Sequence, residues 1–338
     1  MKVGIVGATG YAGLELLRLA ASHPDLEVVL ATGDSNAGKR VRDHAPALAG
    51  LYPELTFAAT SEVLEATLDV VFLALPHGHS QSLVPSLLER GMQVVDLGAD
   101  YRLKNPDHYF DWYGEPHQSK ELLDLSVYGL VERHRSELVG AQLIAVPGCY
   151  PTATSLALGA FTDHDLVQRE GIVVNALSGT SGAGRATSDR LHFSRMSSNA
   201  EAYGLLHHRH TIEMQQEMGA ELLFTPHLVP MSRGMLITAY ARAVEGTFTT
   251  DDALSHLRTT YAHDRFVVVT DDPPTFKDPV GSNLCFVSAR VDPRTGWLVA
   301  MSSLDNLIKG AAGQAIQAWN VATLRPEATG LPLSGVTP

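Results

Sequence analysis

Cys149 is the residue in this sequence with the clearest potential for chemistry, and it lies in a Pro-Gly-Cys-Tyr-Pro segment. The apolar run from Gln142 to Val146 predicts a short buried strand, which the Pro-Gly pair ends. Pro151 suits the first turn of a helix, and the apolar residues from Ala153 to Phe161 continue that helix. We therefore expect Cys149 at the N-terminal end of a helix, where backbone N–H groups and the helix dipole favour an anion.

A cysteine in this position has two interpretations. A lowered pKa would make Cys149 a reactive thiolate and a nucleophile. Alternatively, Cys149 is a small buried apolar residue, as many unpaired cysteines are. The local pattern leaves both open. The second cysteine, Cys285, lies in an apolar alternation and is expected in the core.

Three histidines and an arginine stand together at residues 207–210. They suggest either a metal site or a general base beside an anion clamp. The sequence offers no convincing further metal ligands, and His207 and His208 are adjacent and cannot share one helix face. We therefore predict no metal. Because His208 and His210 are two residues apart, we expect their side chains to diverge, so that only one of them faces Cys149.

The beginning of the chain predicts a dinucleotide-binding unit. A strand at residues 2–6 is followed by Gly7, Gly10 and Gly13 and then by a helical pattern. Such glycines let the backbone approach a pyrophosphate at a helix N-terminus. A glycine triplet alone is weak evidence, but the strand on one side and the helix on the other strengthen it.

The end of the second predicted strand, residues 26–32, gives mixed signals about the cofactor. Asp34 favours NAD, because an acidic residue there binds the ribose 2′-hydroxyl. Ser35, Lys39 and Arg40 favour the 2′-phosphate of NADP. The residues alone leave the choice open.

Three further segments could contact a ligand. Pro76-His77-Gly78-His79-Ser80 follows an apolar strand at residues 69–75 and is expected to form part of the cofactor wall. The glycine- and serine-rich loop 178–185 could hold a phosphate or carboxylate on its N–H groups. Asp100 and Arg102, after the strand 93–97, are most simply read as a surface ion pair.

Composition limits the function classes. The 338 residues are 45% hydrophobic and 18% charged, enough for about two domains with real cores. The net charge of -12 argues against nucleic acid as a partner. No apolar run is long enough for a membrane helix, and residues 1–6 lack the layout of a signal peptide. Two cysteines fit a reducing cytoplasm.

The order of predicted elements indicates an α/β protein. Alternating strands and helices over residues 1–148 predict a Rossmann-type domain with a parallel sheet, interrupted by an aromatic, irregular stretch at 104–121. A helix is also expected at 81–90. Residues 149–304 are strand-rich and predict a second, α+β domain with a mixed sheet. The small-residue helix and tail at 305–338 are expected to return to the first domain.

Taken together, the motifs resemble N-acetyl-γ-glutamyl-phosphate reductases of the aspartate-semialdehyde dehydrogenase-like superfamily. The similarity covers nearly the whole chain, and its specific parts come in the family's order. They are Gly7-Ala8-Thr9-Gly10-Tyr11-Ala12-Gly13, Ala74-Leu75-Pro76-His77-Gly78, Asp96-Leu97-Gly98-Ala99-Asp100-Tyr101-Arg102, Pro147-Gly148-Cys149-Tyr150-Pro151-Thr152, Ser181-Gly182-Ala183-Gly184-Arg185, His208-Arg209-His210, Thr225-Pro226-His227-Leu228-Val229-Pro230, and residues 305–315. Ile212 stands where the family more often has proline.

The resemblance implies an NADPH-dependent oxidoreductase of arginine biosynthesis. Such an enzyme reduces N-acetyl-γ-glutamyl phosphate to the semialdehyde, releases phosphate, and passes through a cysteine thioester. It implies Cys149 as nucleophile and His208 as the proton-transfer residue, with His210 the close alternative. The implied cofactor contacts are Gly7, Thr9, Gly10, Tyr11, Ala12, Gly13, Ser35, Lys39, Pro76, His77, Ser181, Gly182 and Asn306. The implied substrate contacts are Arg102, Arg185, Arg209 and Lys309.

Two alternative functions remain open beside this interpretation, and the protein is expected to form a homo-oligomer. A lysine-pathway paralogue would act on an aminoadipyl phosphate linked to an acidic carrier protein, but the charge of -12 shows no basic docking face. A non-catalytic NADP-binding scaffold would carry an inert cysteine. The resemblance also implies a homodimer or homotetramer with a small-molecule substrate, without nucleic-acid or membrane partners.

Overall fold

The protein was analysed as a computed structural model that describes residues 1–244 and 248–336. The chain divides into two compact units. The first contains Met1–Pro147 and Ala311–Leu331, and the second contains Gly148–Gly310 and the segment from Pro332. Sequence reasoning placed the divisions at 148/149 and 304/305. Residues 337 and 338 of the predicted tail, and 245–247 of the predicted second domain, lie outside the described residues.

The first unit is built on a seven-stranded sheet in which every strand pair is parallel, in the order β3-β2-β1-β4-β5-β7-β6. Its elements are β1 Lys2–Val6, α1 Tyr11–Ala20, β2 Glu27–Thr32, α2 Val41–His44, β3 Phe57–Ala58, β4 Val70–Leu73, α3 Val84–Glu89, β5 Gln93–Asp96, α4 Pro106–Tyr113, β6 Val127–Tyr128, α5 Val131–Leu138, β7 Leu143–Ala145 and α10 Gly313–Ala322. All four residues of β4 are buried, as expected for a strand covered on both faces. The predicted Rossmann-type sheet is confirmed.

The strand order reverses between β1 and β4, which makes this the switch point of the sheet. The turns that follow these two strands begin at Gly7 and Ala74, at the same edge of the sheet. Parallel α/β sheets bind ligands beyond this edge. The fold thus brings the glycine turn and the Pro76–Ser80 turn into neighbouring positions.

Three predicted elements differ from the structure in detail. The helix expected at 81–90 begins only at Val84, after a 3₁₀ turn at Ser80–Ser82, because Pro85 belongs in a first helical turn. The stretch 104–121, expected to be irregular, contains α4, which Asn105 caps through its side chain and Gly114 ends in the left-handed region. The helix expected from residue 305 opens with a single π-helical turn, η8 Ile308–Ala312.

The second unit contains a mixed sheet in the order β12-β13-β14-β11-β8-β10-β9. Pairs β12–β13 and β8–β10 are parallel, and the remaining pairs are antiparallel. The elements are α6 Cys149–Thr162, β8 Ile172–Gly179, α7 Phe193–Met196, β9 Glu201–Ala202, α8 His210–Met218, β10 Leu222–Val229, β11 Met235–Arg242, α9 Thr250–Thr260, β12 Val267–Val269, β13 Cys285–Val291 and β14 Trp297–Leu304. The predicted mixed sheet is confirmed.

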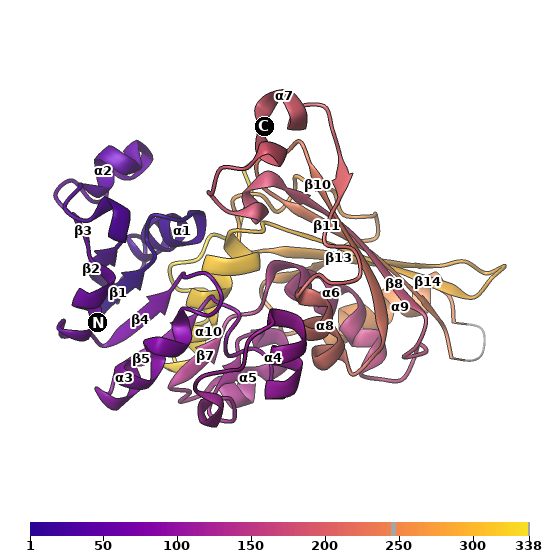
Figure 1. Cartoon of the computed structure of the whole chain (residues 1–338). Helices are drawn as coiled ribbons and strands as arrows, with labels where there is room; N and C mark the ends of the chain where they lie inside the picture. The colour runs from indigo at the N-terminus through magenta and orange to yellow at the C-terminus, as the bar shows by residue number, and fades with distance from the viewer. Residues whose placement is uncertain (245–247, 337–338) are drawn as a thin grey trace. The chain divides into compact units, whose positions relative to one another are not determined.

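Helix α6 forms the centre of the second unit. It packs against β11, β13 and β14, and α8 and α9 contact it (Figure 1). Every residue of α6 after Cys149 is buried. Ser302 on β14 donates a hydrogen bond to the Ala153 carbonyl at 2.7 Å, which fixes the helix to the sheet. A buried, anchored helix gives its first residue a defined position.

Helix α10 belongs to the first unit although it comes last in the chain. It contacts α5 and β5 and is drawn in yellow among darker elements (Figure 1). All ten of its residues are buried. None of the described helices has the length and apolar character needed to cross a membrane.

Candidate active site

Cys149 is the first residue of α6, and Gly148 is the N-cap. The Gly148 carbonyl accepts the backbone N–H of Thr152, and also the Thr152 hydroxyl at 3.0 Å. Gly148 has no side chain that could cap the first N–H groups of the helix. The helix terminus therefore favours the thiolate form of Cys149.

His210 is the imidazole that lies against this turn. A Cβ added to Gly148 would lie 2.4 Å from Nε2 of His210, so the ring packs directly on the Gly148 backbone. His210 is also the first residue of α8, which contacts α6. Two helix N-termini thus supply the cysteine and the histidine. Glycine at position 148 is what allows their close approach.

His208 lies in a ring cluster beside this pair. Its ring centroid is 5.5 Å from Tyr150, 5.5 Å from Tyr203 and 5.3 Å from Phe224. Its Nδ1 accepts the backbone N–H of His210 at 3.2 Å. Burial, followed by the positive charges of Arg209 and His207, lowers the pKa of His208 to about 4. His208 is therefore neutral near pH 7.

The expected divergence of the two histidines is wrong. Their ring centroids are 4.9 Å apart, and both rings contact Tyr150. The expectation assumed an extended or helical backbone. In the structure the His208 ring turns back at the start of α8, so that its Nδ1 accepts the backbone N–H of His210. This contact brings both imidazoles to one side.

Two hydroxyl groups complete the ring cluster. The Tyr150 and Tyr203 hydroxyls form a hydrogen bond of 2.9 Å. Burial raises the pKa of both hydroxyl groups, so both stay protonated. Tyr150 follows Cys149 directly, and the cluster therefore fixes the first turn of α6 from the side that faces the histidines.

Glu213 is a residue that sequence reasoning missed. It is 1% exposed, and its Oε1 accepts the backbone N–H of Gly148 at 2.8 Å. It lies three positions after His210, one turn further along α8. Its signal in the sequence was that spacing, but glutamate in a first helical turn is more often solvated. Here Glu213 ties α8 to the residue before Cys149.

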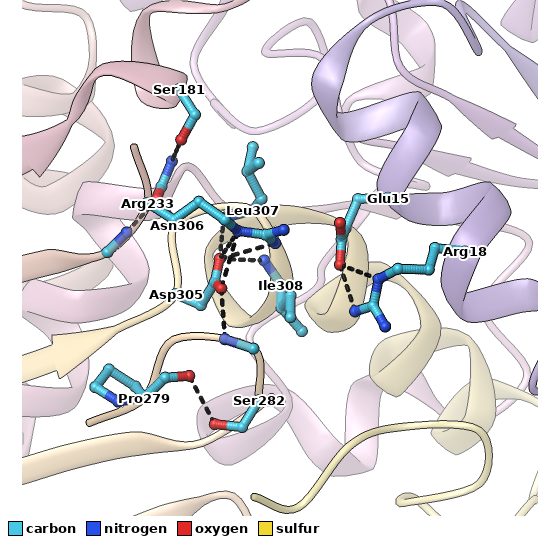
Figure 2. A network of polar contacts seen from close by, with 12 residues as sticks. Glu15, Arg18, Ser181, Arg233, Pro279, Ser282, Asp305, Asn306, Leu307 and Ile308 are labelled. Carbon is cyan, nitrogen blue, oxygen red and sulfur yellow. Dashed lines mark hydrogen bonds and ion pairs between the residues drawn. The ribbon is translucent and has the colours of Figure 1, made fainter. Parts of the chain in front are cut away.

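Asp305 is the centre of a second polar network, shown in Figure 2. Its buried carboxylate binds Arg233, with the shorter contact at 3.1 Å, and accepts the N–H groups of Gly281, Leu307 and Ile308. Arg233 is thus paired with a buried carboxylate. One carboxylate therefore holds three loop segments of the second unit together.

Asn306 extends this network to the glycine- and serine-rich loop. Its Oδ1 accepts the N–H of Gly234 at 2.8 Å, and its Nδ2 donates to the Ser181 hydroxyl at 3.0 Å. A Cβ at Gly182 would lie 3.7 Å from the same Nδ2. The structure thus brings together Ser181, Gly182 and Asn306, three of the predicted cofactor contacts.

The π-helical turn η8 connects the Asp305 network to Cys149. The Asp305 carbonyl accepts the N–H of Gly310, five residues later, at 2.9 Å. A Cβ at Gly310 would lie 2.8 Å from the Cβ of Cys149. The wide turn therefore places bare backbone against the thiol side chain and restricts the directions in which the thiol can point.

The glycine turn of the first unit has the shape of a pyrophosphate cradle. Cβ atoms at Gly7 and Gly13 would lie 2.5 Å from the Ala74 carbonyl oxygen and 2.4 Å from the Gly7 carbonyl oxygen, whereas nothing lies closer than 3.6 Å to one at Gly10. Packing thus explains the first and third glycines but not the second. Gly10 caps α1, where an anion is favoured. These residues fit a dinucleotide, and Thr9, Tyr11 and Ala12 lie in the same turn.

In the segment after β2, the residue that favours NAD and the residues that favour NADP have different surroundings. Oδ1 of Asp34 accepts the backbone N–H of Thr60 at 2.7 Å, so this carboxylate has a partner within the protein. Ser35 and Lys39 are exposed. Nζ of Lys39 donates to Asn36 at 3.2 Å, and the Asn36 amide donates to the Ser35 hydroxyl. A hydroxyl and an ammonium therefore lie close together at this edge.

Asp96, the last residue of β5, and Asp100, which follows the strand, are fully buried. The expected surface location of Asp100 and Arg102 is wrong, because both are buried; Arg102 is 7% exposed and donates to the Leu97 carbonyl at 2.8 Å. Burial, and secondarily the charge of Asp100, raises the pKa of Asp96 to about 7. Oδ1 of Asp96 accepts from the hydroxyl of Ser80 and the N–H of Gly98.

Comparison with known proteins identifies the family. Residues 2–141 match the family described as semialdehyde dehydrogenase, NAD binding domain, and residues 149–306 match semialdehyde dehydrogenase, dimerisation domain. A protein of Desulforamulus reducens named N-acetyl-gamma-glutamyl-phosphate reductase is 41% identical, with 100% of both chains covered. Proteins of the same name from Symbiobacterium thermophilum and Dehalococcoides mccartyi are each 43% identical, over 98% of this chain and 97% of theirs. The chain belongs to the N-acetyl-γ-glutamyl-phosphate reductase family.

Solved structures support the fold of this family member. An aspartate semialdehyde dehydrogenase II from Vibrio cholerae, complexed with ASA, aligns with a TM-score of 0.73 at 15% identity, over 95% of this chain and 97% of that one. An aspartate semialdehyde dehydrogenase from Candida albicans, solved with NADP, aligns with a TM-score of 0.65 at 18% identity, over 95% and 97%.

The predicted substrate contacts of this family member are distributed over both units. Arg102 belongs to the first unit, and Arg185, Arg209 and Lys309 belong to the second. Arg185, at the end of the glycine- and serine-rich loop, is exposed. Lys309 is fully buried, and its ammonium lies 5.9 Å from the Phe266 ring centroid. Among the described residues, no group of three or more His, Cys, Asp or Glu side chains could hold a metal ion.

Proposed function

We propose that this protein reduces N-acetyl-γ-glutamyl phosphate to N-acetyl-glutamate semialdehyde with NADPH, releasing phosphate, as a step of arginine biosynthesis. The observation that carries the proposal is Cys149 at the N-terminus of α6 with the His210 ring packed on Gly148. The name that the full-length relatives share supports this substrate over a carrier-linked aminoadipyl phosphate or a non-catalytic role.

The chemistry begins at the thiol of Cys149. The thiolate attacks the acyl carbon, the bond from that carbon to the phosphate oxygen breaks, and inorganic phosphate leaves with the bonding electron pair. The product is a thioester on Cys149. NADPH, when bound, supplies the hydride that reduces this thioester. Collapse of the resulting thiohemiacetal releases the aldehyde and returns the thiolate.

We assign the proton transfer to His210. The resemblance ranked His208 first and His210 second, but only the His210 ring packs on Gly148, beside the nucleophile. A general base works best with a pKa near the working pH, and the pKa of His208 is about 4. We give His208 the role of holding His210, since its Nδ1 accepts the His210 N–H.

The anionic groups of the substrate are assigned to the arginines and to Lys309. Arg102, Arg185 and Arg209 offer forked donors that suit phosphate and carboxylate. The cofactor is assigned to the glycine turn, to Pro76 and His77, and to the Ser181, Gly182 and Asn306 group. Ser35 and Lys39 are assigned to the 2′-phosphate of NADP, since Asp34 is already bonded to Thr60.

The second unit supports a homo-oligomer. On β8, β10 and β11, alternate residues are buried under the helices, while the others remain partly exposed, among them Leu177 at 37% and Leu223 at 49%. A partly exposed sheet face, on which these leucines lie among polar residues such as Asn175, Thr225 and Thr238, fits a second copy of the same face, in agreement with the dimerisation family that matches residues 149–306. We propose a homodimer or homotetramer in the cytoplasm.

The decisive experiment is the reverse reaction. Purified protein is given N-acetyl-glutamate semialdehyde, inorganic phosphate and NADP⁺, and reduced cofactor is followed at its absorbance band. Phosphate-dependent reduction is the expected result. A protein that binds NADP⁺ but shows no phosphate-dependent turnover would be a scaffold, and the aminoadipate analogue, run in parallel, tests the other substrate.

A further inference from the structure

The turn after β4 is held by a single carboxylate. Asp100 is fully buried, and its two oxygens accept the N–H groups of Gly78 at 2.7 Å and Ser80 at 3.0 Å. Gly78 has a φ of +83°, a conformation that few other residues adopt. Asp100 therefore fixes the backbone that follows Pro76 and His77, two proposed cofactor contacts.

Tyr109, on α4, fixes Asp100 in turn. Its hydroxyl donates to Oδ1 of Asp100 at 3.0 Å and accepts from Nε2 of Gln81 at 2.8 Å. Gln81 is the residue after Ser80, so Tyr109 bonds both the carboxylate and the chain that the carboxylate holds. Nε2 of His117 bonds the Asp100 carbonyl at 2.8 Å. These bonds hold Asp100 and Gln81, the two residues next to the turn in space or in sequence.

The rings of the same segment reach the turn as well. Tyr109 and Tyr113 are stacked with centroids 4.5 Å apart and an interplanar angle of 10°. The His77 ring lies 5.6 Å from Tyr113, and the His117 ring lies 5.0 Å from Tyr109. The aromatic stretch that the sequence left without a role thus packs beside the proposed cofactor wall, within the first unit.

We propose that Tyr109 is a positioning residue for the cofactor, acting through Asp100 on the Gly78–Ser80 turn. The turn lies at the carboxyl edge of β4, next to the glycine turn after β1, where a dinucleotide binds in sheets of this kind. Binding affinity falls when a contact loop must be ordered on binding. This role rests on the proposed function, because it concerns the site for NADPH.

The test is Tyr109→Phe, which removes the hydroxyl and keeps the ring stack. NADPH affinity is measured by fluorescence titration, alongside kcat and both KM values. We expect Kd and KM for NADPH to rise by about three- to tenfold, the effect of losing one or two buried hydrogen bonds. The alkylation rate of Cys149 should stay within about twofold, since Cys149 belongs to the second unit whereas Tyr109 and Asp100 belong to the first.

Tyr52→Phe is the matched control. Its hydroxyl donates to the carbonyl of Leu17, in the second half of α1 of the same unit, at 2.8 Å. We expect a similar fall in Tm for both variants, with NADPH affinity changed only in Tyr109→Phe. If both variants bound NADPH with equal affinity, Tyr109 would have only a structural role, and the proposal would be overturned.

Asp100→Asn provides a second variant with nearly unchanged volume. It replaces one acceptor oxygen with a donor facing an N–H group, so the loss in NADPH affinity should exceed that of Tyr109→Phe. If Asp100→Asn folds and binds NADPH like the wild type, the turn does not depend on this carboxylate and the proposal fails. Failure of the proposed function is distinguishable, because the wild type itself would then show no NADPH turnover.

Discussion

The two units each present a helix N-terminus capped by glycine, and they use it differently. Gly10 caps α1, where nothing lies closer than 3.6 Å to an added Cβ. Gly148 caps α6, where the His210 ring fills that position and Glu213 takes the Gly148 N–H. The glycine-capped helix N-terminus is therefore open in the first unit and surrounded by side chains in the second.

This difference shows how the surroundings of a helix N-terminus determine its function. Around α1, glycines remove side chains, which leaves N–H groups and space for a ligand to occupy. Around α6, the terminus carries a thiol, and His210, Glu213 and the Gly310 backbone surround it. The first arrangement suits binding and the second suits reaction. Substitutions at each terminus should separate these tasks.

The largest effect is expected for Cys149→Ser. Turnover should fall by about 10⁴-fold or more, because a serine alkoxide is much harder to form than a thiolate near neutral pH. NADPH affinity should stay at the wild-type value, since the α1 terminus is untouched. Steady-state kinetics and a fluorescence titration measure the two quantities. Residual activity above a few per cent would exclude the covalent route.

Cys285→Ser is the control for that change. Cys285 is fully buried on β13, so the serine variant should lose about 1–3 kcal/mol in free energy of unfolding and keep its kcat. Thermal unfolding and initial rates distinguish the two cysteines.

The next largest effect concerns the histidines. His210→Asn should lower kcat by about 10²–10⁴-fold, the range for a lost acid–base group, and slow the alkylation of Cys149 by iodoacetamide near pH 7. His208→Asn should have a smaller effect on kcat. Because the pKa of His208 is about 4, His208 stays neutral from pH 5 to 9 and adds no step to the alkylation profile in this range. The opposite pattern in paired pH profiles would return the proton-transfer role to His208.

At the α1 terminus, Gly10→Val should act on the cofactor alone. The site has room for a side chain in the free protein and Gly10 has an extended backbone, so the fold should survive. NADPH affinity should fall by about tenfold or more, because the valine fills the space proposed for the pyrophosphate. Labelling of Cys149 by an acyl phosphate should persist. Gly13→Val, where the added Cβ meets backbone at 2.4 Å, should instead lower Tm sharply.

The smallest effect is expected at the edge of the same unit. Lys39→Ala should lower the NADPH/NADH ratio of kcat/KM by about tenfold or less, the value of an exposed charged contact. Asp34→Ala should barely change the ratio, since the Asp34 carboxylate is bonded to Thr60. A large gain for NADPH in Asp34→Ala would mean that this carboxylate faces the ribose and selects NAD.

Periodicity predicted the sheets well and the details near the site less well. The strands around β4 and the helix after Cys149 follow from apolar runs and from proline and glycine signals. Helix α4 was missed although Asn105, Pro106 and Gly114 carry capping signals, because its aromatic residues lack clear amphipathic spacing. Hydrophobic pattern identifies what is buried, but a short polar helix is identified by its ends.

The site itself depends on contacts that are distant in sequence. Nothing local announces that the His208 ring turns back onto the His210 N–H, which brings the two rings within 4.9 Å of each other. Glu213 and Asp100 read as ordinary solvated acids, yet each is buried because backbone N–H groups from another segment bond to it. Burial of a charged residue is set by its tertiary partners, which a single sequence does not show.

The return of α10 to the first unit has a consequence for how the protein is made. A ribosome delivers the chain from the N-terminus, and domains usually fold as they emerge. Here α10, whose residues are all buried in the first unit, is synthesised only after the whole of the second unit. The surfaces of α5 and β5 that contact α10 therefore stay uncovered through most of translation. Nascent chains of this protein should need protection from aggregation at those surfaces until residue 322 leaves the exit tunnel.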